Sequence, residues 1–252
     1  MSAGRPTVPR YDGRTASQLA SLLDLPAVEL FERVTSTQDV AHELGARGAP
    51  AGSLVLANAQ TAGRGRGTRE WRSAPGAGIW MTLLERPGDG AAVGVLSLRL
   101  ALRVAPVLEP WTQAPVEVKW PNDLLVRDRK LAGVLVEARW RGARPDWVAI
   151  GIGVNVHPPE GLDAAALHDV RDRVAVLEVL VPAIRATCTA TGPLNADELA
   201  RYAERDAVRG RRCAAPESGI AAGITPDGAL IIRGAEGERL VRSGSLVLEE
   251  QP

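Results

Sequence analysis

Hydrophobic and polar positions follow two different periods along the first third of the chain. Apolar residues spaced three and four apart predict a short helix over 15–23, which Thr15 can cap, and a second helix that ends near Gly48. The second helix begins after Ser36, and Asp39 follows three residues later in the pattern of a capping box. Alternating or wholly apolar runs predict three strands, over 28–34, 53–60 and 79–85. The polar run after the first strand therefore lies at a strand-to-helix junction.

The middle of the chain predicts a buried helix followed by antiparallel strands. The helix spans 91–109, with Arg99 and Arg103 on one exposed stripe. Four β-like runs follow, VEVKW, LLVR, LAGVLVEARW and DWVAIGIGVNV, and the turns between them are too short for helical crossovers. Further helices are predicted around 173–188 and 195–209. From Arg212 onward, short alternating strands with PDG and SG turns are typical of a small β-barrel.

Composition narrows the class of protein. With 252 residues, 45% hydrophobic and 24% charged, the chain is large enough for one substantial core and a small second domain. Its zero formal net charge argues against a dedicated nucleic-acid binder. No apolar run reaches the length of a membrane span, and the first residues lack the apolar segment of a signal peptide, so we expect a cytoplasmic protein. Cys188 and Cys213 have no metal-site spacing and are expected to be small buried hydrophobes.

Lysine is nearly absent from this chain. Of 30 lysines and arginines, only Lys119 and Lys130 are lysine, and both lie in the stretch KWPNDLLVRDRKLAG. An ammonium is a compact point charge on a flexible stem, whereas a guanidinium is a planar fork. The two lysines are therefore candidates for meeting a single anionic oxygen, with chance in a biased composition as the alternative.

The stretch AQTAGRGRGTREW predicts a loop that binds phosphate. Arg64, Arg66 and Arg69 are interleaved with glycines that let backbone N–H groups approach a ligand, and guanidinium groups match phosphate oxygens. Trp71 closes the run and indicates something flat to pack against. A solvated linker and an RNA-binding RG segment are the alternatives.

Two further stretches carry polar groups between apolar runs. In KWPNDLLV, the Asn122–Asp123 pair forms a turn. Asp123 either binds a magnesium ion, through water, or is simply a turn-forming residue. In GIGVNV, close approach of a ligand and tight strand packing explain the glycines equally well, and Asn155 is polar among apolar neighbours. His42, His157 and His168 lack metal-ligand spacing and are expected to be structural or surface residues.

The order TSTQ, QTAGRGRGTREW, KWPND, RKLAG, GIGVNV and a small β tail resembles the biotin protein ligase family over 28–252. The resemblance implies that biotin and Mg-ATP form biotinyl-5′-adenylate and pyrophosphate, and that a lysine of a biotin carboxyl carrier domain then takes the biotinyl group. It also implies an α+β fold, with a mixed, largely antiparallel sheet in the catalytic domain and an SH3-like barrel after it. The corresponding segments are an N-terminal segment 1–27, a catalytic domain 28–208 and a C-terminal domain 209–252.

The resemblance also implies roles for individual residues. Lys130 and Arg66 would be catalytic. The biotin pocket would comprise Ser36, Thr37, Gln38, Gln60, Arg64, Gly65, Arg66, Trp71, Lys130 and Gly133. ATP would be bound by Arg64, Arg66, Arg69, Lys119, Asn122, Asp123 and Asn155, with Asp123 also attending magnesium.

Several features depart from the family pattern or remain open. The loop has its glycine at Gly67 with Thr68 after it, and Gln38 stands where the family often has Asn. The stretch before TSTQ is too short for a winged helix, so we expect no binding to operator DNA. Because no apolar run reaches the length of a membrane span, we also expect no membrane association. We expect a monomer or weak homodimer. A lipoate or octanoate ligase of the same fold and a non-enzymatic RNA-binding protein are the alternative functions.

Overall fold

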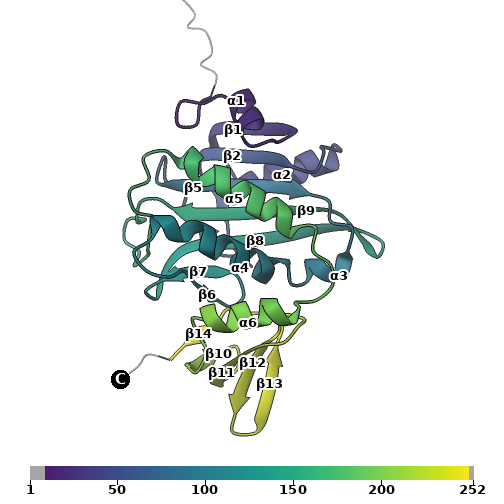
Figure 1. The fold of residues 1–252 in the computed structure, drawn as a ribbon, viewed down its shortest axis with the longest axis vertical. Coiled ribbons are helices and arrows are strands. Elements are labelled where there is room, and N and C mark those ends of the chain that lie inside the picture. Colours follow the sequence, from purple (N-terminus) through teal and green to yellow (C-terminus); the bar gives the residue numbers. More distant parts are fainter. Residues whose placement is uncertain (1–8, 250–252) are drawn as a thin grey trace, which may run out of the picture.

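A seven-stranded mixed sheet forms the centre of the molecule (Figure 1). The computed structural model describes residues 9–249. In sheet order the strands are β1 (Ala27–Val34), β2 (Ser53–Gln60), β5 (Gly78–Glu85), β9 (Arg144–Asn155), β8 (Arg129–Arg141), β7 (Asp123–Val126) and β6 (Glu117–Lys119). β1 and β2 are parallel and the other neighbours are antiparallel, so the predicted α+β class with a mixed sheet is confirmed.

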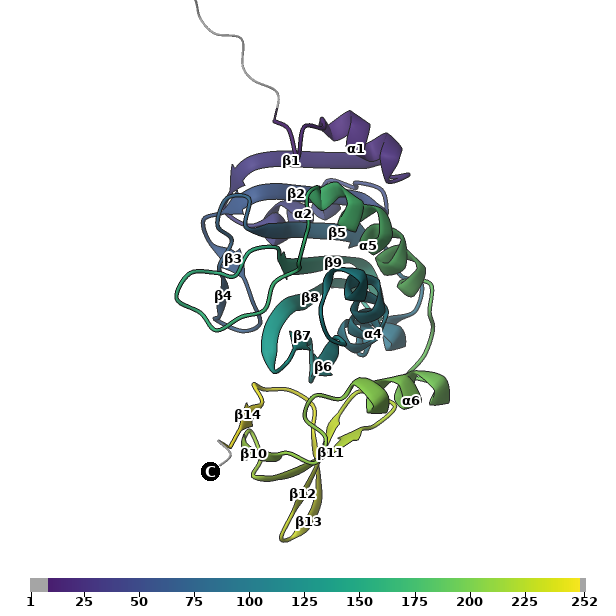
Figure 2. The ribbon, with the colours of Figure 1, turned by 60° about the vertical axis from the view of Figure 1, so that its left-hand side comes forward.

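Helices cover both faces of this sheet, because its central strands are apolar on both sides. Leu54 and Leu56 of β2 belong to the large core beneath α4 (Leu96–Leu108) and α5 (Arg173–Thr187). Val55, which lies between them, points to the other face and packs with Ala41 of α2 (Thr37–Ala46). Figure 2 shows α4 and α5 together on one side of the strands.

The smaller helices follow local signals, with some changes in extent. Thr15 caps α1 (Ala16–Leu22), as predicted, and it forms a capping box with Gln18. The segment predicted as one helix over 91–109 is divided into α3 (Gly90–Val93), α4 and a 3-10 turn, η1 (Glu109–Trp111). The last helix, α6 (Ala196–Arg205), ends earlier than predicted.

The prediction that Arg99 lies on an exposed stripe is wrong. Its side chain is 3% exposed, and its Nε lies 2.6 Å from Glu198 Oε1 on α6. The guanidinium also donates to the carbonyl oxygens of Gly192 and Pro193. A buried guanidinium needs such partners, and Glu198 lies too far along the chain for helical periodicity in α4 to predict the contact.

A five-stranded antiparallel sheet lies beyond β6 and α6, at the lower end of the molecule in Figure 1. Its strands, in sheet order, are β13 (Gly237–Val241), β12 (Leu230–Gly234), β11 (Gly219–Ile224), β10 (Arg212–Ala215) and β14 (Val247–Leu248). Within residues 9–249, β13 and β14 are not paired, so the predicted barrel is not closed by hydrogen bonds. The sheet shares its core with the larger one, and Trp120 Nε1 donates to Gly228 O at 2.9 Å.

The termini limit what can be compared with the expectations. Residues 1–8 of the expected N-terminal segment and residues 250–252 of the expected C-terminal domain lie outside the described residues. None of the described helices has the length and apolar character needed to cross a membrane.

Candidate functional site

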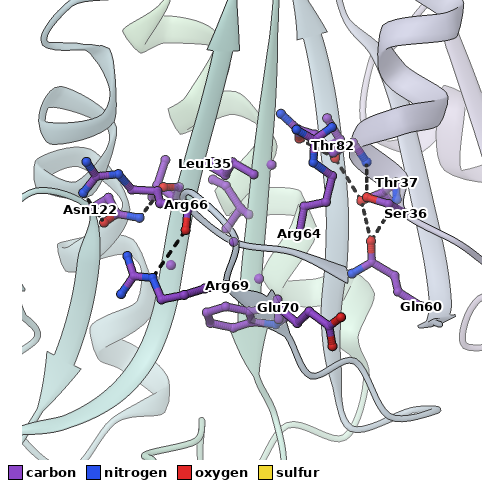
Figure 3. Close-up of a pocket in the computed structure, with 18 of the residues that line it drawn as sticks. Ser36, Thr37, Gln60, Arg64, Arg66, Arg69, Glu70, Thr82, Asn122 and Leu135 are labelled. Atoms are coloured by element: carbon purple, nitrogen blue, oxygen red, sulfur yellow. Dashed lines mark hydrogen bonds between the residues drawn. The ribbon is translucent and has the colours of Figure 1, made fainter. Parts of the chain in front are cut away.

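A cavity lies beside the N-terminus of α2, on the same face of the sheet as that helix (Figure 3). Most of the residues expected at a site line it together: Ser36, Thr37, Gln38, Gln60, Arg64, Gly65, Arg66, Arg69, Trp71, Asn122, Asp123, Lys130 and Gly133. They come from segments far apart in the sequence, which the sheet order β2-β5-β9-β8-β7 brings side by side. The motifs singled out in the sequence therefore converge on one cavity.

One wall of the cavity is neutral and polar. Ser36 is the N-cap of α2, and its hydroxyl accepts from Gln38 N at 3.2 Å. Gln60 Oε1 accepts from both Thr37 N, at 2.8 Å, and Thr37 Oγ1, at 3.1 Å. Thr82 Oγ1 donates to Thr37 Oγ1 at 2.9 Å. These hydroxyl and amide groups form one hydrogen-bonded network, which can exchange partners with a neutral polar ligand without burying a charge.

Gln38 is held deeper in the same wall. Its Nε2 donates to Ala149 O at 3.1 Å, and its Oε1 accepts from Thr82 Oγ1 at 3.2 Å. A Cβ on Gly151 would lie 2.6 Å from this Oε1. Glycine at 151 leaves room for the amide of Gln38, which is one answer to the question raised by the GIGVNV stretch.

The indole of Trp71 lies on a glycine pair that joins β8 and β9. Gly133 and Gly153 are register partners, and a Cβ would lie 2.8 Å from Trp71 Cζ3 at the first and 2.5 Å from Trp71 Cε2 at the second. Trp80 meets the indole edge-on, with ring centroids 6.3 Å apart. Trp71 Nε1 is buried without a hydrogen-bond partner in residues 9–249. Trp71 lines the cavity, while its Nε1 is buried on the side of Gly153.

Lys130 is the one lysine among the residues that line the cavity. Its Nζ lies 2.8 Å from Asp123 Oδ1 and 4.8 Å from the centroid of the Trp71 ring. The Lys130 side chain is 38% exposed, so this ion pair is accessible from the cavity. A flexible ammonium held by one carboxylate and one aromatic face can move to an anionic ligand at small cost.

The glycine–arginine loop crosses the mouth of the cavity. Its ends pair as β3 (Gly63–Arg64) and β4 (Glu70–Trp71), and Gly65 N donates to Arg69 O at 2.8 Å. Gly67 has φ +64, a left-handed conformation that favours glycine and explains its shifted position in the loop. Burial, and then the neighbouring charge of Arg69, lower the pKa of Arg66.

Arginines from the loop reach opposite sides of the cavity. Arg66 Nη1 lies 3.5 Å from Asn122 Oδ1 and 3.4 Å from Gly244 O of the smaller sheet's last loop. Arg64 instead lies beside α2, where its Nη1 is 2.7 Å from Asp39 Oδ1. Figure 3 shows Arg64 near Thr82 and Arg66 near Asn122. Asp39 therefore pairs with Arg64, and the capping box predicted from Ser36 and Asp39 does not form.

Two expected site residues lie outside the cavity lining. Lys119 is in β6, and Asn155 donates to the carbonyl oxygens of Lys130 and Ala165 at 3.2 and 3.0 Å. Their contacts with nucleotide stay predictions. In the described part of the chain, no three His, Cys, Asp or Glu side chains gather in a way that could hold a metal ion. Among the carboxylates of the lining, Asp123 lies next to Lys130.

Sequence reasoning missed the single polar residues that strands contribute. Thr82 looks like part of an apolar strand, and Glu137 like an ordinary solvent-facing residue, yet both hold site residues in place. Strand alternation places each on a given face, but only the order of strands in the sheet shows which side chains they meet. His42, expected to be structural or exposed, is half-buried and contacts Glu137.

Two family models match the chain. The biotin/lipoate A/B protein ligase family matches residues 30–155, and the biotin protein ligase C terminal domain matches residues 208–248. Among curated relatives, the biotin--[acetyl-CoA-carboxylase] ligase of Paracoccus denitrificans is 36% identical over 234 residues, covering 84% of this chain and 96% of that protein.

Longer relatives and solved structures also match. The bifunctional ligase/repressor BirA of Bacillus spizizenii is 43% identical over 125 residues, which are 49% of this chain but only 38% of that protein. A biotin protein ligase from Aquifex aeolicus, solved in complex with biotin and ATP, has a TM-score of 0.71 at 25% identity. That likeness covers 90% of this chain and 100% of the Aquifex chain.

Proposed function

The chain belongs to the biotin protein ligase family, and from this premise we propose that it attaches biotin to a protein at the expense of ATP. The acceptor is a lysine on a biotin carboxyl carrier domain of a biotin-dependent carboxylase. The intermediate is biotinyl-5′-adenylate. We take residues 28–208 as the catalytic unit and residues 209–252 as the C-terminal unit. In this proposal the protein acts in the cytoplasm as a monomer or weak homodimer and does not bind DNA.

The observation that carries this proposal is the polarity gradient along one cavity. Ser36, Thr37 and Gln60 offer neutral hydroxyl and amide groups at one end, which suit the neutral ureido ring of biotin. The indole of Trp71 offers a flat apolar surface between the ends. Lys130 and Arg66 supply positive charge at the other end, where a carboxylate and a phosphate must meet.

The first step brings two anions together. A biotin carboxylate oxygen attacks the α-phosphorus of ATP, a P–O bond forms, and the bond to pyrophosphate breaks. In this proposal the Lys130 ammonium offsets the charge on the nonbridging oxygens, and Arg66 and Arg69 offset the charge on the phosphates; their place in the lining of the same cavity supports these roles. The loop that carries these arginines covers the cavity and shields the mixed anhydride from water.

The second step transfers the acyl group. The ε-amino group of the acceptor lysine attacks the biotinyl carbonyl carbon, an amide bond forms, and AMP leaves with the bonding electrons. The neutral amine is the nucleophile, so the acceptor must lose a proton before or during attack. The exposed side of Lys130 is where the acceptor chain can enter.

Magnesium fits this site through few protein ligands. Mg²⁺ often uses one or two carboxylates and completes its shell with phosphates and water. Asp123 supplies a suitable hard oxygen beside Asn122 in the lining. When bound with ATP, the ion would supply charge neutralisation at the phosphates. Asp123 itself holds Lys130, which is its role in the described structure.

The test is direct. The purified chain is mixed with biotin and ATP labelled at the α-phosphate, and we expect pyrophosphate release and a bound adduct that contains both label and biotin. Addition of a carrier domain should then discharge the adduct as AMP and biotinylated protein. Lipoate and octanoate compete in parallel reactions, and preference for either acid over biotin would overturn the substrate assignment.

A further inference from the structure

Arg64 is held by two carboxylates from separate parts of the fold. Its Nη1 lies 2.7 Å from Asp39 Oδ1 on α2, and its Nη2 lies 2.5 Å from Glu137 Oε1 on β8. The hydrogen bond that Arg64 donates to Asp39 is the largest cause of the raised pKa of Arg64. The guanidinium fork is therefore used on both prongs, in the geometry that distinguishes arginine from lysine.

Glu137 is itself held by a third element. Its other oxygen, Oε2, lies 3.1 Å from His42 Nε2. Trp147 Nε1 donates to His42 Nδ1 at 3.1 Å. An indole N–H can only donate, so His42 Nδ1 accepts and the ring proton lies on Nε2, which donates to Glu137. The hydrogen bond from His42 is the largest cause of the lowered pKa of Glu137.

Arg66 and Arg69 are in a different position. Neither forms an ion pair with a carboxylate in residues 9–249; Arg66 contacts the Asn122 amide oxygen and a carbonyl, and Arg69 contacts the Arg66 carbonyl. Arg64 faces two negative charges, so its own charge is more than offset before any ligand arrives. A phosphate that approached Arg64 would be repelled by the two carboxylates unless it displaced them. The charges of Arg66 and Arg69 are not offset by a paired carboxylate, so both can attract a phosphate.

The geometry points to different roles for the arginines of the loop. This inference rests on the proposed function. We propose that Trp147, His42 and Glu137, together with Asp39, hold Arg64 as a positioning residue that anchors the loop to α2, and that the nucleotide phosphates are met by Arg66 and Arg69. Arg64 is thereby removed from the set of direct ATP ligands implied by the family resemblance.

The anchor has a structural consequence at Trp71. Arg64 pairs with Glu70 and Gly63 pairs with Trp71 across the short β3–β4 hairpin. Fixing Arg64 on α2 therefore fixes the register that sets the indole on Gly133 and Gly153. Releasing Arg64 loosens the Trp71 surface for biotin and the placement of Arg66 for ATP at the same time.

The decisive variant frees Arg64 from its carboxylates. In Asp39→Asn/Glu137→Gln, a direct phosphate ligand would gain available charge, so KM for ATP would fall or stay unchanged. If Arg64 is an anchor, this variant loses it, because the two charge-assisted bonds to Asp39 and Glu137 are replaced by weaker neutral ones. We then expect KM for both biotin and ATP to rise about tenfold, with kcat changed less than about threefold. The two roles thus predict opposite signs for the change in KM for ATP.

A second variant tests the two-pronged contact. In Arg64→Lys a point charge remains, but it cannot bridge Asp39 and Glu137 together. An anchor predicts that Arg64→Lys is as impaired as Arg64→Gln, whereas a phosphate ligand predicts that lysine retains most of the activity. The control is Glu43→Gln, on the same helix in an exposed pair with Arg47, which should match the unaltered protein.

Hydrogen exchange in the free protein supplies a measurement that needs no substrate. We expect faster exchange at residues 63–71 in Asp39→Asn/Glu137→Gln, with the melting temperature close to that of Glu43→Gln. Unchanged exchange together with lower KM for ATP would overturn the anchor. If the unaltered chain makes no adenylate, the proposed function fails, while the exchange result still decides whether Arg64 anchors the loop.

Discussion

Lys130 is one of two positions at which this chain has lysine in place of arginine. Its Nζ reaches Asp123 Oδ1 at 2.8 Å while lying over the indole of Trp71. A guanidinium is wider than an ammonium and its charge is spread over a plane, so it cannot turn from the carboxylate to a ligand oxygen in the same space. The rarity of lysine pointed to a residue that lines the cavity, and its catalytic role stays a prediction.

We predict that Lys130→Arg keeps the fold and biotin binding but slows adenylation at least about tenfold, which corresponds to about 1.4 kcal/mol in the barrier. The measurement is the single-turnover rate of pyrophosphate release at saturating biotin and ATP. Arg129→Lys, at the neighbouring exposed position, is the control and should keep the rate. A normal rate in Lys130→Arg would remove the requirement for an ammonium.

Gly153 offers a test of the Trp71 surface. A Cβ at this position would lie 2.5 Å from Trp71 Cε2, so Gly153→Ala must push the indole away from the strand. Overpacking of this kind costs about 1–3 kcal/mol, and we expect biotin affinity to fall by about tenfold. Calorimetric titration with biotin measures it. Gly94→Ala, where a Cβ would meet only ordinary contact, should bind biotin normally; equal affinity in both variants would contradict the role of Trp71.

At the scale of elements, predictions from the sequence succeeded where the signal is local. The capped helix α1 and the apolar strand β5 follow from their own residues. The lining of the cavity was predicted as far as its residues lie in continuous motifs, because each motif carries several lining residues together. Glu137 and Thr82 could not be found in this way, since each is one polar residue in a strand whose neighbours depend on the sheet order.

The arginine stripe on α4 failed for a related reason. Arg99 and Arg103 lie on nearly the same side of the helix, but Glu198 and the Gly192 carbonyl cover only the first of them. Periodicity describes the helix and cannot describe what a distant element brings to it. The same holds for Asp39, whose local capping signature is overridden by Arg64.

The loop over the cavity leads to a prediction about ordering. The β3–β4 hairpin has two paired positions, and the residues of its tip are half-buried or exposed, so its amides open easily without a ligand. We expect residues 63–72 to exchange hydrogen faster in the free protein than with biotin plus ATP, with the largest gain in protection at 65–69. Hydrogen exchange followed by mass spectrometry measures it. Equal protection in both states would exclude closure of the loop on ligand.

At the scale of the molecule, the two sheets share one continuous core and several polar links. Trp120 donates to Gly228 across the junction, and Arg66 of the loop reaches Gly244 of the smaller sheet. The helix α6 lies between the sheets and is tied to α4 through Arg99 and Glu198. We therefore expect the position of the smaller sheet next to the cavity to depend in part on a buried ion pair that lies outside the cavity lining.

This ion pair permits a test in which the shape is kept and the charge is removed. Glu198 accepts from Arg99 and also from Asn195 N at 2.9 Å in the capping box of α6. Arg99 Nε donates to Glu198 Oε1 and Asn195 N donates to Oε2, so the one oxygen of Glu198→Gln can keep only one of these two bonds, and Arg99 stays buried without a counter-charge. Removing one partner of a buried pair costs about 3–5 kcal/mol, and we expect a loss of that order in the free energy of unfolding.

Urea denaturation of Glu198→Gln measures this loss, with Glu43→Gln as the matched control. Glu43 pairs with Arg47, and both side chains are mostly exposed, so neutralising it should change the free energy of unfolding by less than about 1 kcal/mol. The contrast between the same substitution at two sites assigns the loss to the buried ion pair and its hydrogen bonds, because side-chain length and helix propensity are matched. Equal small losses at both sites would mean that the carbonyl oxygens of Gly192 and Pro193 alone compensate Arg99, and that the junction does not depend on the Glu198 charge.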